Sequence, residues 1–222
     1  MSLSIVSCKS FGAHTAEMLE TSCAKYGLNL NFYEIGQFVG FRQMKLDRLI
    51  PYLKSLNSEL VMYTDSTDSW ILNPDIEQVY KDNFDGKVVV SGNRDHYPHT
   101  NLYSSFPEAP TSMRYICCSQ FIGPREKVIN TLETIQSKWT FGDTDQEGWH
   151  YCFVNGWGEI NIDYYCKLFL NMTNVSLDEI TPDLIFKETG NKFASWHFGG
   201  PKAGSENGLN MKKAYEMWKG LN

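Results

Sequence analysis

Two acidic residues directly behind an apolar segment are the strongest chemical signal in this sequence. Residues 60–64 read Leu-Val-Met-Tyr-Thr, Asp65 follows at once, and Asp68 comes three positions later. In an open α/β sheet, ligands bind at the carboxyl ends of the strands, so both carboxylates are expected where a substrate phosphate and its cation collect. Asp and Ser also favour turns, so a purely structural role for these residues stays open.

A second chemical pattern lies near the end of the chain, where residues 196–202 read Trp-His-Phe-Gly-Gly-Pro-Lys. His197 leaves a predicted strand and enters a turn. The glycines of this turn, Gly199 and Gly200, tolerate unusual dihedral angles and expose backbone amides. With the positive charge of Lys202, the turn predicts a cradle for a diphosphate. A packed or surface position for His197 is the alternative.

Two further polar segments have both a chemical and a structural interpretation. Residues 143–146 read Asp-Thr-Asp-Gln and could begin a helix with Asp143 as its N-cap. Residues 94–99 read Arg-Asp-His-Tyr-Pro-His and follow a predicted strand. This second segment either lines a site or forms an ordinary solvated loop.

The elements that must position these residues alternate between strand and helix. Apolar periodicity predicts strands at residues 4–7, 28–35, 60–63, 87–91 and 115–122, and helices at 14–26, 45–56 and 124–139. Helix or strand is expected up to residue 165, then a strand from Phe193 and a final helix to about Trp218. The order predicts an α/β fold of Rossmann type, with a mostly parallel sheet covered by helices on both faces.

Composition and charge narrow the class of protein. A chain of 222 residues with 42% apolar and 21% charged residues is typical of one globular domain, here residues 1–222. The net charge of −6 disfavours a large sequence-independent contact with nucleic acid, although a local basic groove stays open. No signal peptide or membrane-spanning stretch is apparent, which predicts a cytoplasmic protein without a membrane partner. Six cysteines without a C-x-x-C pair are expected to be reduced and mostly buried.

Five motifs follow one another along the chain. They are Thr-Asp-Ser-Thr-Asp at 64–68, Ser-Gly-Asn at 91–93 with Tyr-Pro at 97–98, Ile-Cys-Cys-Ser-Gln-Phe-Ile-Gly at 116–123, Asp-Thr-Asp-Gln at 143–146, and His-Phe-Gly-Gly-Pro-Lys at 197–202. Together they resemble the glycosyltransferase domain of the procollagen lysyl hydroxylase family, a nucleotide-sugar enzyme of GT-A type. The family motifs read T-D-S-x-D, S-A-E with W-P, L-N-S-G-x-F-I-G, D-D-D-Q and H-G-N-G-P-x-K.

The chain departs from the family at positions that face the donor sugar and the acceptor. Asn93 stands where the family has the glutamate of S-A-E, and Thr144 replaces the middle aspartate of D-D-D-Q. The Asn-Ser-Gly of the central motif is also replaced, at about residues 118–120. The resemblance therefore carries over neither the sugar nor the acceptor.

Together, the resemblance and the chemistry of the residues assign roles. Two carboxylates and an imidazole, from Asp65, Asp68 and His197, are expected to bind Mn²⁺ or Mg²⁺, with the histidine favouring Mn²⁺. The predicted nucleotide-sugar-binding residues are Ser7, Lys9, Lys45, Thr64, Gly199, Gly200 and Lys202. Ser7 and Lys9 are expected at the uracil and ribose, and Lys45, Gly199, Gly200 and Lys202 at the diphosphate.

Asp143, Asp145 and Gln146 are the predicted catalytic residues. If the reaction inverts the anomeric centre, one of the two acids is expected to act as base on the acceptor hydroxyl. If it retains the configuration, as the resemblance favours, the acids are expected to stabilise an oxocarbenium-like transition state.

The resulting prediction is a metal-dependent glycosyltransferase that moves a hexose or pentose from a UDP-sugar to a hydroxyl acceptor on a glycan, protein or modified DNA base. The nucleotide-sugar half is expected at about residues 1–90 and the acceptor and closing-turn half at about 91–222. Three alternatives stay open: transfer to a hydroxymethylated DNA base, a metal-dependent nucleotidyltransferase or phosphohydrolase, and a non-catalytic carbohydrate-binding domain. The DNA alternative predicts a basic strip. Its members would be Lys9, Arg42, Lys45, Arg48, Arg94 and Arg114.

Overall fold

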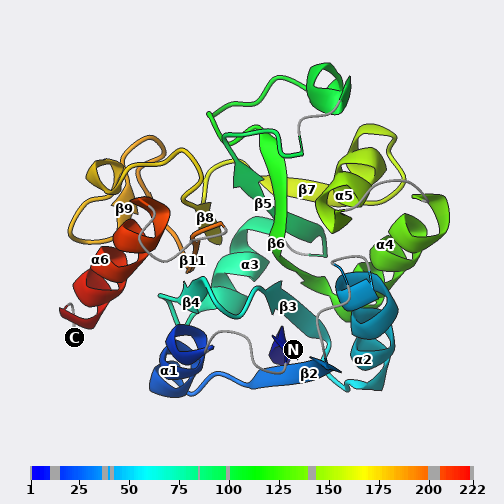
Figure 1. The fold of residues 1–222 in the computed structure, drawn as a ribbon, viewed down its shortest axis with the longest axis horizontal. Helices are drawn as coiled ribbons and strands as arrows, with labels where there is room; N and C mark the ends of the chain where they lie inside the picture. The colour runs from blue at the N-terminus through cyan, green and yellow to red at the C-terminus, as the bar shows by residue number, and fades with distance from the viewer. Residues whose placement is uncertain are drawn as a thin grey trace.

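A central six-stranded sheet organises the protein. The computed structural model describes residues 2–10, 16–36, 40, 43–84, 86–98, 101–139, 144–199 and 206–220. The strands of the central sheet, in spatial order, are β2 (Leu30–Gly36), β1 (Leu3–Ser10), β3 (Leu60–Thr64), β6 (Tyr115–Pro124), β5 (Val88–Asn93) and β7 (Ile160–Asp163). All the predicted strands up to residue 122 are present in this sheet, so the predicted α/β class is confirmed (Figure 1).

The sheet is mostly parallel, with one exception. β1 is parallel to β2 and β3, and β5 is parallel to β7, but β6 runs antiparallel to both β3 and β5. A parallel connection needs a crossover, usually a helix. Within its described residues, the segment from 94 to 114 contains only the short 3₁₀ helix η2 (Asn101–Ser105), and the chain returns antiparallel. The apolar pattern of β6 carries no information about strand direction, so sequence could not predict this exception.

Helices cover both faces of the sheet. α1 (Glu17–Tyr26) and α3 (Ile76–Phe84) pack on the face formed by Leu60 and Met62 of β3. α2 (Leu49–Ser55), α4 (Arg125–Lys138) and α5 (Asp145–Val154) pack on the face formed by Val61 and Tyr63. The alternation of side chains along β3 therefore divides the core into two layers, as predicted.

The helix predicted at 45–56 has two parts. Residues Gln43–Arg48 form a π-helical turn, η1, and α2 follows directly. Pro51 has no amide hydrogen and cannot donate to the carbonyl of residue 47, which favours a departure from α-helical geometry just before it. Such π-turns are frequent at functional sites, and this one contains Lys45.

A small second sheet was predicted only in part, through the strand expected from Phe193. It contains β4 (Ser69–Ile71), β11 (Ser195–His197) and β8 (Phe169–Asn171), in the order β4-β11-β8. Strands of three residues are too short to show the period-2 pattern from which longer strands are predicted. Trp70 and Trp196 pair across β4 and β11, and both are fully buried in the core beneath this sheet.

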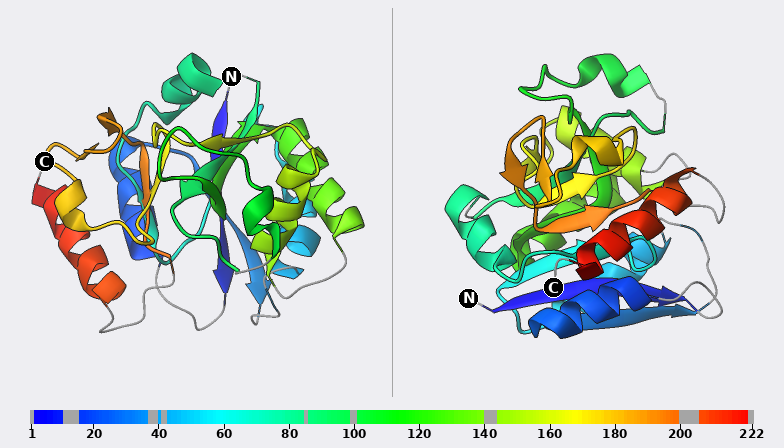
Figure 2. Two further views of the ribbon diagram at one scale, coloured as in Figure 1. Left: turned by 90° about the horizontal axis from the view of Figure 1, so that it is seen from above. Right: turned by 90° about the vertical axis from the view of Figure 1, so that its left-hand side faces the viewer.

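The final helix, α6 (Glu206–Gly220), lies beside the small sheet, on the opposite side of the molecule from α4 and α5 (Figure 1 and Figure 2). The remaining elements are the hairpin strands β9 (Ile185–Phe186) and β10 (Asn191–Lys192) and the 3₁₀ helix η3 (Leu177–Glu179). All six cysteines are buried and unbridged, as predicted. Across the described parts of the chain, no helix has both the length and the apolar character needed to cross a bilayer.

Candidate active site

A cavity of about 600 Å³ lies where β1 and β3 end. The predicted acids Asp65 and Asp68, the amino-terminal turn of α5 and His197 of the small sheet all line it. Both sheets therefore contribute to one concave site, at the carboxyl ends of parallel strands, where α/β proteins bind their ligands.

Backbone contacts fix the turn that carries the two acids. The Asp65 N–H donates to the Ser119 carbonyl at 3.0 Å, which ties the end of β3 to β6. The Ser69 hydroxyl donates to the Asp65 carbonyl at 2.7 Å and closes the turn. At its far end, the Phe198 N–H donates to the Asp68 carbonyl at 2.9 Å. The turn therefore joins the central sheet to the strand that carries His197.

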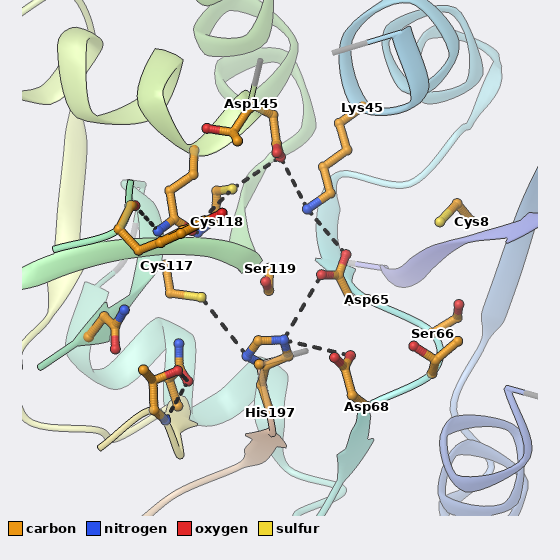
Figure 3. A pocket seen from close by; sticks show the side chains of 18 of the residues that line it. Cys8, Lys45, Asp65, Ser66, Asp68, Cys117, Cys118, Ser119, Asp145 and His197 are labelled. Atoms are coloured by element: carbon orange, nitrogen blue, oxygen red, sulfur yellow. Dashed lines mark hydrogen bonds and ion pairs between the residues drawn. The ribbon is translucent and has the colours of Figure 1, made fainter. Parts of the chain in front are cut away.

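Three predicted metal ligands converge in the cavity (Figure 3). His197 Nε2 lies 3.6 Å from Asp68 Oδ1 and 4.0 Å from Asp65 Oδ2. One ligand atom from each residue lies within 4.8 Å of the other two. The ligands of a six-coordinate ion with bonds of about 2.1 Å are about 3 Å apart when adjacent and about 4.2 Å when opposite. The three side chains are therefore close enough to become ligands of a small divalent cation such as Mn²⁺ or Mg²⁺ once the separations between His197 and the carboxylates shorten by up to about 1 Å.

Cys117 contacts the other ring nitrogen of His197, with 3.9 Å between Cys117 Sγ and His197 Nδ1. Burial alone lowers the pKa of His197, but Asp68 and Cys117 outweigh it and raise the pKa to about 9. Burial raises the pKa of Cys117, and the neighbouring His197 reverses this, so that the net change is downward. A contact on the second nitrogen fixes the orientation of the ring, as is usual for metal-binding histidines.

Lys45 joins the predicted metal site to a predicted catalytic acid. Its Nζ lies 3.2 Å from Asp65 Oδ1 and 3.1 Å from Asp145 Oδ2, and its side chain is 4% exposed. Burial alone lowers the pKa of Lys45, but Asp145 and Asp65 outweigh this and raise it well above its ordinary value. Burial raises the pKa of Asp65, and Lys45 and His197 bring it below its ordinary value. Lys45 is therefore a charged bridge between two acids.

Helix α5 delivers Asp145 and Gln146 to the opposite wall of the cavity. Asp145 Oδ2 accepts from Cys118 Sγ at 3.1 Å. Gln146 Oε1 accepts from the Cys118 N–H at 3.4 Å, and Gln146 Nε2 donates to the Tyr97 carbonyl. The amide of Gln146 thus ties α5 to β6 and to the loop after β5. α5 has Thr144 as its N-cap residue, whereas Asp143 lies outside the described residues.

Three predicted binding residues do not line the cavity. The Ser7 hydroxyl is buried and donates to the Thr64 carbonyl at 2.6 Å. Thr64 is also buried, and its hydroxyl accepts from Gln120 Nε2 at 3.1 Å. The Lys9 side chain is 59% exposed and lies 3.6 Å from Glu20. Of the predicted diphosphate cradle, Gly199 lines the cavity. Gly200 and Lys202 lie outside the described residues.

Of the basic strip expected for a DNA acceptor, Arg94, Arg114 and Lys45 are engaged in contacts within the protein, whereas Lys9 and Arg48 are exposed. The Arg94 guanidinium contacts Glu179 at 2.6 Å and Glu188 at 2.9 Å. Arg114 donates to the Pro107 carbonyl at 2.9 Å and also to the Phe106 carbonyl. Lys45 is buried, as described above, and Arg42 lies outside the described residues.

Asn171 and Thr173 also line the cavity, and sequence reasoning missed both. Asn171 is the cross-strand partner of His197 in the small sheet. One signal could have found it, because Asn171 follows the apolar residues Leu168-Phe-Leu170 just as Asp65 follows an apolar strand. Thr173 has no comparable signal in the sequence.

A comparison with known protein families gives a match over most of the chain. The sequence model of the PLOD GT domain matches residues 15–197, a range that contains all three predicted metal ligands and Asp145. No curated protein matches the chain significantly. Among solved structures, the crystal structure of A197 from STIV is 12% identical in sequence. The match covers 73% of this chain and 81% of the A197 chain, with a TM-score of 0.47.

Proposed function

The chain belongs to the family of the PLOD GT domain, a glycosyltransferase domain, and we propose that its cavity binds a UDP-sugar through a divalent cation and transfers the sugar to a hydroxyl acceptor. The observation that carries this proposal is the convergence of Asp65, Asp68 and His197 inside a cavity at the ends of parallel strands. The two acids come from the nucleotide-sugar half proposed at about residues 1–90, and the histidine comes from the other half.

Asp65, Asp68 and His197 hold the cation, for which Mn²⁺ is preferred over Mg²⁺ because one ligand is a nitrogen. A bound cation neutralises the charge that develops on a departing nucleoside diphosphate. A bound cation also stabilises the carboxylates of Asp65 and Asp68, because it compensates their negative charge. Without the cation, His197 provides part of this compensation. The donor set thus favours binding of a cation together with an anionic ligand.

The lack of a side chain at Gly199 allows close packing against Thr173 and His197. A Cβ at this position would lie 3.0 Å from Thr173 Oγ1 and 3.5 Å from His197 Cε1. A side chain at position 199 would therefore collide with Thr173, so the backbone of Gly199 can lie against this part of the cavity wall only without a Cβ. We propose that Gly199 and the predicted residues Gly200 and Lys202 hold the diphosphate beside His197.

Asp145 serves the sugar and the acceptor. Lys45 separates it from Asp65, so the carboxylates of the metal site and of the catalytic wall do not repel each other directly. The same lysine lowers the pKa of Asp65 and so favours its ionised form, and its Nζ also lies 3.1 Å from Asp145 Oδ2. Gln146 positions Asp145 by anchoring the first turn of α5, and Asp143 is proposed as the second acid of this wall.

The proposal can be tested by measuring the slow release of UDP from a panel of UDP-sugars. The release is measured first with Mn²⁺ and then with EDTA. We expect one donor to be hydrolysed with Mn²⁺, and chelation or the substitution Asp145→Asn to abolish the hydrolysis. The matched control is Asp82→Asn, which alters an exposed acid on α3. Hydrolysis that persists in EDTA would contradict the cation site. Binding of free sugar without cation or nucleotide would instead support the carbohydrate-binding alternative.

A further inference from the structure

A second cavity lies at the opposite edge of the central sheet from the candidate active site. It has a volume of about 280 Å³, and its lining includes Val88, the first residue of β5, and Glu159, which precedes β7. Asn93, the last residue of β5, lines the active-site cavity instead. A rise of about 3.3 Å per residue places the two ends of β5 about 17 Å apart. The second cavity is therefore a separate site.

Trp157 supplies an aromatic wall to this second cavity. After α5 the chain turns at Gly156, which has a φ of 64°, and the Trp157 N–H donates to the Cys152 carbonyl at 2.9 Å. Lys138, the last residue of α4, has its Nζ 4.9 Å from the centroid of the indole ring. These contacts hold the ring beside α4 while part of it stays exposed. The negative face of an aromatic ring attracts weakly positive C–H groups, so Trp157 can pack against a ligand that presents them.

Three uncharged polar residues of α4 also line the second cavity, namely Asn130, Thr131 and Thr134. The Thr134 hydroxyl donates to the Asn130 carbonyl at 2.7 Å, which leaves its oxygen able to accept. Among the described residues, neither the Asn130 amide nor the Thr131 hydroxyl has a hydrogen-bond partner, and Thr131 is only 4% exposed. An amide and a hydroxyl both donate and accept, so this wall can bind hydroxyl groups of a ligand.

The charges at the rim of the second cavity are paired with each other. Among the described lining residues, Lys127 is the one cation, and its Nζ lies 2.5 Å from Glu159 Oε2. A phosphate or carboxylate therefore finds no unpaired cation in the lining. A purely apolar ligand would leave the polar groups of α4 without the hydrogen bonds that water gives them. The lining accordingly favours an uncharged ligand that has both hydroxyl groups and an apolar C–H face.

We propose that the second cavity binds one neutral sugar ring of a glycan, which packs on Trp157 and forms hydrogen bonds with Asn130 and Thr131. A sugar ring is uncharged, carries hydroxyl groups at its edge and presents C–H groups on its faces, so it meets all the requirements of the lining. The volume is at the lower end of the range for small-molecule sites, which suits a single ring rather than a nucleotide sugar. This inference goes beyond the proposed function, because the site needs neither the cation nor the nucleotide.

A titration followed by ¹⁵N–¹H correlation spectra tests the proposal, with the methyl glycosides of glucose, galactose, mannose and xylose as probes. The signals to follow are the indole N–H of Trp157 and the backbone amide of Gly158, which also lines the cavity. We expect at least one glycoside to shift both signals, with a Kd in the millimolar range because the ligand is small. The same Kd is expected in EDTA and in Mn²⁺ with UDP.

Substitutions in the wall separate a binding role from a structural one. Trp157→Ala should raise Kd at least about tenfold, as followed at the Gly158 amide, whereas Trp157→Phe keeps an aromatic face and should lie between Trp157→Ala and the wild type. Thr131→Val keeps the shape of the side chain but removes the hydroxyl, and should raise Kd about two- to tenfold. Tyr165→Ala, at an exposed aromatic residue outside this cavity, should match the wild type. Urea unfolding checks that each variant is folded.

The outcomes distinguish this inference from the proposed function. The second site would be overturned if no glycoside shifted the Trp157 and Gly158 signals, or if the binding required Mn²⁺ or UDP. Sugar binding that is unchanged in Trp157→Ala would lie elsewhere on the protein and would also overturn it. If the shifts at Trp157 were present but UDP did not bind in Mn²⁺, the proposed function would fail and the second site would stand.

Discussion

Asp68 and His197 are joined through both their side chains and their backbones. His197 Nε2 lies 3.6 Å from Asp68 Oδ1, and the Asp68 carbonyl accepts from the N–H of Phe198, the residue after His197. β4 and β11 enforce this arrangement by pairing Ser69 with His197. The small sheet therefore sets the width of the proposed cation site, while the central sheet supplies Asp65.

Replacement of the bridging lysine should destabilise the protein strongly. Lys45→Met leaves the buried Asp145 and the partly buried Asp65 facing each other without compensation, and breaking a buried ion pair in this way costs about 3–5 kcal/mol. The free energy of unfolding, from urea titration in the absence of metal, measures the loss. Lys54→Met is the matched control, because Lys54 pairs with Glu133 at the surface and should lose less than about 1 kcal/mol. Similar losses in the two variants would argue against a buried bridge.

The thiol beside His197 should tune the affinity of the cation site. Cys117→Val removes the contact to Nδ1, and loss of such a partner of a metal-binding histidine lowers affinity about 10- to 100-fold. Cys117→Ser keeps a hydrogen-bonding group there and should stay nearer to the wild type. Mn²⁺ titration followed by electron paramagnetic resonance measures both. Cys152→Ala, at a buried cysteine of α5 outside the cavity lining, is the control. Equal affinities in Cys117→Val and wild type would show that the thiol has no such role.

His150 should make the fold sensitive to mild acid. Burial lowers the pKa of His150 to about 4, so the folded state keeps it neutral while the unfolded state takes up a proton below about pH 6.5. The unfolded state binds more protons in this window, and stability therefore falls as the pH decreases from 6.5 to 4, by up to about 3 kcal/mol. Urea unfolding at several pH values should show a shallower decline for His150→Phe than for the wild type. Parallel declines would exclude His150 as the cause.

The central sheet and its helices could be predicted from the sequence because these elements are long enough to show a periodic pattern of apolar residues. The strand that ends at Thr64 and the helix from Arg125 to Lys138 both matched. Gly27 adopts a positive φ of 64° at the end of α1, as its position as a stop signal predicted. The antiparallel direction of β6 and the pairing of the small sheet were not predicted from the sequence, although the strand from Phe193 was. The direction depends on how a loop returns, and the pairing joins three-residue strands that are distant in the sequence.

The candidate site was predictable to a similar degree. Acids after a strand and a histidine before a Gly-Gly turn carry a local signal, and Asp65, Asp68 and His197 do converge. Lys45, predicted at the diphosphate, lines the cavity and also bridges Asp65 and Asp145, a pairing that the sequence did not indicate. A buried ammonium group needs compensating charges within reach. Ser7 and Thr64 were predicted at the nucleotide sugar, but the face of the strand on which each side chain lies buries both outside the cavity lining.

UDP binding measured by calorimetry with Mn²⁺ and with EDTA tests the central claim most directly, in the wild type, Asp68→Asn and the surface control Asp82→Asn. The account predicts that wild type and Asp82→Asn bind UDP with Mn²⁺ and lose binding in EDTA. Asp68→Asn should bind at least about tenfold more weakly in Mn²⁺, with its unfolding transition preserved. Equal UDP binding with and without the cation, or by Asp68→Asn and wild type, would contradict the account.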